Sequence, residues 1–117
     1  MNCPTCQTPM SVSELHCTGC NLSLRGQFGL PRLARLSKDN MKLAEDFILF
    51  GGNLKSIAEK MDISYPTLRR KVDDMIEELR SIQETDRRKA DDILKNIEEG
   101  KMSAQEGLRL IREMNNT

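Results

Sequence analysis

The chain has 117 residues, enough for one ordinary domain or a few small modules. Hydrophobic residues make up 38% and charged residues 31%, which suits a helical protein with modest cores. An aromatic content of 3% argues against the base-stacking platforms of single-strand-binding proteins. Basic and acidic side chains number 18 each, so any nucleic-acid binding must come from a local basic patch and not from the whole surface.

The sequence has no pattern for membrane insertion or export. No apolar run approaches the roughly 18 residues of a membrane-spanning helix. The N-terminus, MNCPTCQT, has no charged region followed by an apolar region, so it does not read as a signal peptide. We therefore expect a cytoplasmic protein, in which paired cysteines bind metal more often than they form disulfides.

Residues 1–28 contain two Cys-x-x-Cys pairs separated by ten residues. Each pair can turn two thiolates toward one ion, and two pairs complete a tetrahedral shell with no open position for catalysis. The segments SVSEL and NLSLRGQF alternate apolar and polar residues, as short strands do, and two such strands need a metal ion to fold. We predict a zinc ribbon with a structural zinc ion, held by Cys3, Cys6, Cys17 and Cys20.

Two alternatives concern the ribbon. Either cysteine pair could be a redox dithiol, although the sequence has no thioredoxin-like βαβ pattern. His16, the only histidine, stands next to Cys17. We expect it to contact a metal ligand from outside the shell or to face solvent; the alternative is that it replaces one thiolate as a ligand.

Residues 29–37, GLPRLARLS, form a connector. Its leucines recur at every third position, and Pro31 can start a short helix. We expect a bridging turn that docks the ribbon on the next domain. Arg32 and Arg35 can in addition contact DNA phosphates, because the basic and the apolar side chains point in different directions.

Residues 38–83 predict a helix-turn-helix domain. The segment SKDNMKLAEDFILF predicts a helix that Ser37 caps and Gly51–Gly52 ends. The apolar stripe of this helix consists of Met41, Ala44, Phe47 and Ile48. Asn53 then caps a second helix, LKSIAEKM. Asp62 occupies the turn position where glycine is usual because that residue often has a positive φ, which Asp tolerates at some cost.

A long third helix follows Ser64. Its apolar stripe consists of Leu68, Val72, Met75, Ile76, Leu79 and Ile82. At about 100° per residue, Arg70 lies almost opposite this stripe. The N-terminal part of such a helix meets base edges in the DNA major groove, where Arg can pair with guanine. We predict that double-stranded DNA is contacted by Tyr65, Thr67, Arg69, Arg70 and Lys71, assisted by Arg32 and Arg35.

The same three helices also fit a packing module with an ordinary solvated face. Asp73 and Asp74 lie three and four residues after Arg70 and can pair with it. A protein-binding role for the domain therefore stays open.

Residues 84–117 predict a C-terminal helical hairpin. A charged break, ETDRRK, leads into a helix that carries Ala90, Ile93, Leu94 and Ile97. Gly100 ends it, and Ser103 with Glu106 forms a capping box for the last helix, which we expect to bury Leu108, Ile111 and Met114. Two short helices must pack on something, either their own chain or another. We predict a homo-oligomer, formed through the long helix after Met75 and this hairpin.

Several segments resemble known families. ISYPTLRRKV is similar to the second helix of Fis-type and sigma-region-four-like helix-turn-helix domains. Residues 1–83 resemble the prokaryotic DUF2089 family of unknown function, which joins a zinc ribbon to such a domain; the cysteines, the LHC and LPRLARL segments and the ISYPT turn carry the match. ILKNIEEGKMSAQEGLRLIREM looks like the short helical-hairpin module at the ends of bacterial envelope-stress and regulatory proteins. The resemblance implies a transcription-regulator-like protein with an oligomerisation or partner-docking module.

We therefore expect a mainly α fold with a small β zinc ribbon, a tri-helical helix-turn-helix core and a C-terminal helical hairpin. The predicted function is a DNA-binding transcriptional regulator that acts as a dimer. The alternative is a protein-interaction adaptor that binds a transcription or stress-response partner. We do not expect an enzyme, because the sequence has no Gly-rich phosphate loop, no nucleophile–base pair and no open metal position.

Overall fold

The computed structural model describes residues 2–115. Its elements, in chain order, are β1 (Val12–His16), β2 (Ser23–Phe28), the short 3-10 helix η1 (Arg32–Arg35), α1 (Lys38–Leu49), α2 (Leu54–Met61), α3 (Tyr65–Glu98) and α4 (Ala104–Asn115). The protein is mainly α-helical with one small antiparallel sheet, which confirms the predicted fold class.

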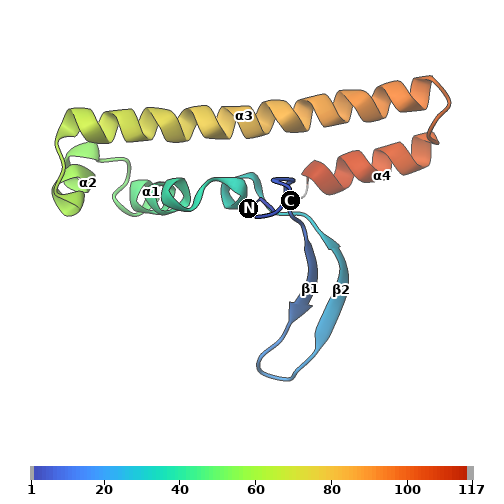
Figure 1. Ribbon diagram of the computed structural model, residues 1–117, viewed down its shortest axis with the longest axis horizontal. Coiled ribbons are helices and arrows are strands. Elements are labelled where there is room, and N and C mark those ends of the chain that lie inside the picture. The colour runs from blue at the N-terminus through green and yellow to red at the C-terminus, as the bar shows by residue number, and fades with distance from the viewer. Residues whose placement is uncertain (1, 116–117) are drawn as a thin grey trace.

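The other helices are arranged along one side of α3. This helix has 34 residues and is about 50 Å long, close to the 55 Å length of the whole molecule. Figure 1 shows α2, α1 and α4 below α3, while its upper side carries no other element. The reason is the predicted apolar stripe: Leu68 and Val72 are buried against α1 and α2, and Ile93 and Ile97 meet α4 at the far end.

The helix-turn-helix core is small. Its buried members are Leu43, Ile57, Ala58, Leu68 and Val72. The predicted turn is confirmed, since Asp62 adopts the left-handed conformation with φ 55° and ψ 47° and its N–H bonds back to α2. Beside the core, the Lys60 ammonium binds the buried Asp46 carboxylate at 2.7 Å and lies 5.5 Å from the centre of the Phe50 ring, which ties α2 to α1.

All four predicted helix caps are confirmed. In each case the cap side chain accepts a hydrogen bond from the backbone N–H three residues later, which satisfies a donor that the helix itself leaves open. The capping residues are Ser37, Asn53, Ser64 and Ser103.

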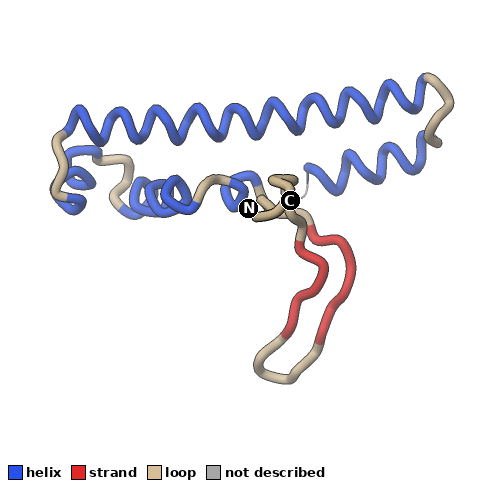
Figure 2. Tube along the Cα trace, in the orientation of Figure 1, coloured by secondary structure: helices blue, strands red, loops and turns tan. Residues whose placement is uncertain are grey.

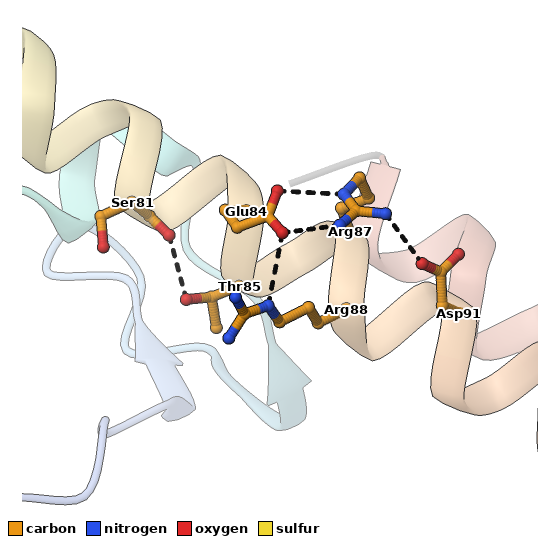
Figure 3. Close-up of polar contacts among 6 residues, drawn as sticks. All are labelled: Ser81, Glu84, Thr85, Arg87, Arg88 and Asp91. Atoms are coloured by element: carbon orange, nitrogen blue, oxygen red, sulfur yellow. Dashed lines mark hydrogen bonds and ion pairs between the residues drawn. The ribbon is translucent and has the colours of Figure 1, made fainter.

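The predicted break at residues 84–89 is wrong, because α3 runs through it without interruption. Figure 3 shows the cause. The Glu84 carboxylate accepts hydrogen bonds from Arg87 and Arg88, and Arg87 also binds Asp91. Charges three and four residues apart support a helix. The Arg87 hydrogen bond is the main reason that the pKa of Glu84 falls to about 2.

Two predicted apolar faces are also corrected. On α1 the buried residues are Leu43 and Asp46, while Met41, Phe47 and Ile48 of the predicted stripe are 37%, 37% and 68% exposed. Burial of Asp46 is tolerated because Lys60 neutralises it. On α4, Leu108 is 54% exposed.

The α4 helix packs closely on α3 through a glycine. Gly107 is buried, and a Cβ atom at this position would lie 2.3 Å from Cδ1 and 2.8 Å from Cγ1 of Ile97. The turn between the helices is made by Gly100 at φ 74°. The C-terminal hairpin is therefore closed within one chain, using the C-terminal part of α3 as its first arm.

The β-hairpin projects from the helices with little packing of its own (Figure 2). The strands pair antiparallel from Val12↔Phe28 to His16↔Ser23, and the predicted strand segments are confirmed. The strand side chains are exposed, apart from partial burial of Val12 and Phe28. His16 faces solvent, and its Nδ1 lies 2.9 Å from the Ser23 hydroxyl.

Within residues 2–115, none of the helices combines the length and the apolar character that crossing a membrane would require.

Candidate nucleic-acid interface and zinc site

The predicted DNA-contacting residues of α3 share an exposed surface at its N-terminal end. The recognition surface, as we name it, consists of Tyr65, Thr67, Arg69, Arg70 and Lys71, all of them exposed. The helix register explains this, because Arg70 is turned about 200° away from Leu68, which is 0% exposed. Arg70 therefore points away from the core, while the other four side chains lie around the remaining exposed sides of the helix.

Of the three basic side chains of the recognition surface, one forms an ion pair in the described part of the chain. Arg69 pairs with Asp73 one turn later at 3.4 Å, with both side chains more than half exposed. Such an exposed pair is weak and exchanges readily for another anion. Within the described part of the chain, Arg70 and Lys71 have no ion-pair partner. The predicted pairing of Asp73 therefore involves Arg69 and leaves Arg70 available.

Thr67 has a second task. Its N–H donates to the Ser64 hydroxyl at 3.3 Å, and the two hydroxyl oxygens lie 2.8 Å apart. The side chain is thus held in the cap of α3, where its orientation is fixed.

A hollow of about 490 Å³ lies between α2 and this cap, lined by Lys55, Ala58, Glu59, Asp62, Ile63, Ser64 and Tyr65. Two carboxylates against one ammonium make it a poor phosphate site.

Arg32 and Arg35 lie elsewhere. Their guanidinium groups bind the carboxylate of Asp86, with Arg32 Nε at 2.9 Å and Arg35 Nη1 and Nη2 at 3.0 and 2.9 Å. Asp86 is 16 residues beyond Arg70, about 24 Å along α3, and on the opposite face. The structure therefore does not join these two arginines to the recognition surface.

Asp86 is a residue that the sequence reasoning missed. It is 7% exposed and occupies the apolar face of α3, seven residues after Leu79. A lone carboxylate on an apolar stripe is a signal that a basic partner packs there. Burial opposes its ionisation, but hydrogen bonds from Arg35 and Arg32 outweigh burial and lower the pKa of Asp86. The arrangement anchors the connector on the middle of α3.

Each Cys-x-x-Cys pair lies in a turn of the same design. In the first turn the N–H of Gln7 donates to the Cys3 carbonyl at 2.9 Å; in the second, Asn21 donates to Cys17 at 2.8 Å. Gln7 and Asn21 have φ values of 62° and 63°. These matching turns are what a metal-binding knuckle requires.

One thiol in each turn has a lowered pKa. Hydrogen bonding with the Thr8 side chain is the main cause that lowers the pKa of Cys6. The backbone N–H groups of Cys20 and Gly19 lower the pKa of Cys17. Zinc binds the thiolate form, so both effects favour it.

The structure does not bring the four thiols together. The first turn precedes β1, and the second closes the far end of the hairpin, so about 17 Å of strand separates them. Among residues 2–115, no three side chains of His, Cys, Asp or Glu are grouped as metal ligands. The donor chemistry fits zinc, and a four-sulfur shell requires the two turns to approach each other.

These features define a zinc-ribbon and helix-turn-helix protein. Three family models match the chain: the DUF2089 zinc ribbon over residues 3–34, the DUF2089 helix-turn-helix domain of unknown function over residues 36–82, and a SHOCT-like domain over residues 90–117. The order of the three matched models is the architecture that the sequence resemblance indicated, and these matches confirm the resemblance. Searches of curated proteins and of solved structures found no match.

The matched domains bear on function at a coarse level. A helix-turn-helix-like domain and a zinc ribbon are compatible with nucleic-acid binding and with zinc binding by the four cysteines. The SHOCT-like domain is compatible with an interaction role. None of the three matched models describes a known enzyme family.

Proposed function

We propose that this protein is a DNA-binding transcriptional regulator that works as a dimer in the cytoplasm. The observation that carries the proposal is the recognition surface, where exposed basic side chains project from the first turns of α3, with Arg70 opposite the buried stripe. The N-terminal part of this helix is the part that enters the major groove in helix-turn-helix complexes. The proposal therefore assigns reading of DNA to one end of α3.

The residues of the surface have different tasks in the proposal. Arg70 points straight away from the core and has no ion-pair partner in the described chain, so we assign it to a base edge. Lys71 and Arg69 contact phosphates, Arg69 after exchanging Asp73 for the DNA anion. Tyr65 and Thr67 lie at the entry of the helix and contact the backbone of the same groove.

Arg32 and Arg35 are left out of the proposed interface. Their guanidinium groups already bind Asp86, and releasing them would leave a buried carboxylate without a partner. We assign them to holding the connector. In the proposal the zinc ribbon binds a structural zinc ion through Cys3, Cys6, Cys17 and Cys20 and has no catalytic role.

The proposal is tested by duplex binding at several salt concentrations. Arg70→Ala should weaken specific binding by about 1–3 kcal/mol, and Lys71→Ala should reduce the salt slope by about 1. Arg80→Ala is the matched control, since this exposed arginine lies ten residues further along α3 and outside the surface. Duplex binding that is absent, or equally affected by Arg70→Ala and Arg80→Ala, contradicts the proposal.

A protein-interaction adaptor is the second candidate. It is favoured by the pairing of Arg69 with Asp73 and by the zero net charge of the chain, which both weaken attraction to DNA. An adaptor would bind its transcription or stress-response partner with little duplex affinity. Loss of partner binding on Arg70→Ala, without any salt-sensitive duplex binding in the wild type, would favour this reading.

A further inference from the structure

Each Cys-x-x-Cys turn brings its own two thiols together. The Cys3 side chain lies within hydrogen-bonding reach of the Cys6 thiol, and the Cys20 side chain lies within the same reach of Cys17. The chain has four cysteines, so the two contacts include every thiol that it contains. Each pair is therefore placed to react within its own turn.

The backbone holds both turns closed. In the first turn the N–H of Cys3 donates to the Thr8 carbonyl at 2.8 Å, and in the second the N–H of Cys17 donates to the Leu22 carbonyl at 2.7 Å. A bond between the two sulfurs of a turn therefore closes a very short loop whose ends already lie together. Such a closure costs little chain entropy.

The strands keep the two pairs apart. β1 and β2 are paired down to His16↔Ser23, next to the second turn, so the second pair is fixed at the far end of the hairpin (Figure 1). The five residues of β1 alone span about 17 Å. A disulfide requires Cα atoms within about 7 Å of each other. A bond from one pair to the other is therefore excluded while the hairpin is formed.

Oxidants reach these thiols from solvent. Cys6, Cys17 and Cys20 are exposed, and Cys3 is partly buried. Hydrogen peroxide is little larger than water and needs no pocket. An accessible thiol with a second thiol beside it is the kind that oxidants convert reversibly to a disulfide. In a reducing compartment such disulfides are usually transient, and catalytic or redox-sensing.

We propose that the ribbon is an oxidant-sensitive element in which zinc and two local disulfides compete for the same four sulfurs. In the oxidised form Cys3 is bonded to Cys6, and Cys17 is bonded to Cys20. Zinc is held by thiolates, so formation of the disulfides releases it. This proposal rests on the structural zinc of the proposed function and adds the reaction that removes it.

The reaction in each turn consumes one molecule of hydrogen peroxide. One sulfur attacks a peroxide oxygen and breaks the O–O bond, which gives a sulfenic acid and one water molecule. The second sulfur attacks the sulfenic sulfur, which forms the S–S bond and releases the oxygen as a second water molecule. The two thiol protons end in these waters, and two electrons pass from sulfur to oxygen. A thiol reductant reverses the reaction by exchange.

The helical part of the chain should not respond to this oxidation. All four cysteines precede β2, and none belongs to the buried core of the helix-turn-helix. The hairpin projects from the helices, and its strand side chains are exposed apart from partial burial of Val12 and Phe28 (Figure 2). Oxidation therefore changes the ribbon and leaves the fold that carries the recognition surface.

Fragment masses of the full chain test the pairing. The zinc-loaded protein is treated with hydrogen peroxide, its remaining thiols are blocked, and it is cleaved without reduction by trypsin and a glutamate-specific protease. Within residues 1–25, Glu14 is the only acidic residue and Arg25 the first basic one, so cleavage places the two pairs on separate fragments, 1–14 and 15–25. Each fragment should carry one internal disulfide and be lighter than its reduced form by two hydrogen atoms.

Zinc release is measured in the same samples with a chromogenic chelator. One zinc ion per chain should be lost as the two disulfides form, and dithiothreitol with added zinc should restore the starting state. Circular dichroism should show the same helix content before and after oxidation.

Single variants provide matched controls. Cys6→Ser should keep the disulfide of fragment 15–25 and lose that of fragment 1–14, and Cys20→Ser should do the reverse. A wild type whose two fragments are joined by a disulfide overturns the proposal. So does a wild type whose thiols become sulfinic acids without disulfides, or one that keeps its zinc after both disulfides have formed.

Failure of this proposal and failure of the proposed function are distinguishable. A chain that holds no zinc when purified contradicts the proposed structural zinc, whereas the fragment masses decide the disulfide pairing in either case. Neither readout uses DNA, so duplex binding is tested separately.

Discussion

The carboxylate of Asp86 accepts two hydrogen bonds from the guanidinium group of Arg35, at 3.0 and 2.9 Å, across 51 positions of sequence. Arg32 adds a third at 2.9 Å. Next to them, Glu78 accepts from the backbone N–H of Ser37 and from the Asn40 side chain. The middle of α3 therefore binds the connector and the start of α1 through carboxylates. The two ends of α3, in contrast, pack on their neighbours through apolar contacts.

The first prediction concerns this anchor. Asp86→Asn should destabilise the chain by about 1–2 kcal/mol, less than a fully buried charged pair because Arg32 is 43% exposed. Asp91→Asn, which removes an exposed partner of Arg87, should change stability by less than about 0.5 kcal/mol. Urea unfolding of the full chain measures both. Equal effects of the two variants would show that Asp86 has no special anchoring role.

The anchor should also respond to acid. Because the pKa of Asp86 is lower in the folded chain than in the unfolded chain, its stabilisation is complete at neutral pH. It is lost as the pH falls through the folded-state pKa. The stability difference between the wild type and Asp86→Asn should therefore shrink in acid. A difference that stays constant between neutral and strongly acidic pH would contradict the ionic nature of the contact.

A second prediction concerns Gly107. In an exposed helix Gly→Ala stabilises by about 1 kcal/mol, but here the new Cβ would lie 2.3 Å from Cδ1 of Ile97. Gly107→Ala should instead destabilise the α3–α4 packing by about 1–3 kcal/mol. Hydrogen exchange of the α4 amides is the measurement. In an Ile97→Ala background most of the cost should disappear, and only the 3.2 Å approach to Cγ2 of Ile93 should remain. An undiminished cost would rule out the clash with Ile97.

The third prediction concerns the helix-turn-helix turn. Asp62 has φ 55°, a conformation that costs a side chain energy and that glycine adopts freely. Asp62→Gly should stabilise the domain by up to about 1 kcal/mol, whereas Asp62→Val should destabilise it. Thermal unfolding followed by circular dichroism compares the two. If glycine destabilised this position, the Asp62 side chain would have to make a contact that outweighs the strain.

A fourth prediction concerns metal. Protein purified without chelator should contain one zinc ion per chain, and Cys17→Ser should lower this content sharply. Because the hairpin packs little on the helices, the same variant should leave urea unfolding of the helical core unchanged. Elemental analysis and circular dichroism measure the two effects. Well under one zinc per wild-type chain would contradict the structural zinc.

Local signals in the sequence predicted local structure well. Ser64 and Asn53 cap helices because their side chains compete for open N–H groups, a property that depends on neighbours within four residues. The left-handed conformation of Asp62 and the two cysteine turns also depend on residues nearby in the sequence. The long stripe of α3 was visible for the same reason, since its period repeats over many turns.

The predictions that were wrong concerned residues whose contacts come from distant parts of the same chain. The buried side of α1 could not be read from its own pattern, because Asp46 is buried only when Lys60 arrives from the next helix. The charged segment 84–89 looked like a break, yet its ion pairs support a helix and Asp86 meets arginines from the connector. The approach of the two cysteine turns also remains a prediction, since no local signal sets their separation.

The most direct measurement of the central claim is selection of duplexes from a random library by the wild type and by Arg70→Ala. The account predicts that the wild type enriches a discrete motif containing guanine, and that Arg70→Ala relaxes the preference at one position while Arg80→Ala does not. A wild type that enriches no motif, or one whose motif is unchanged by Arg70→Ala, would contradict the assignment of DNA reading to α3.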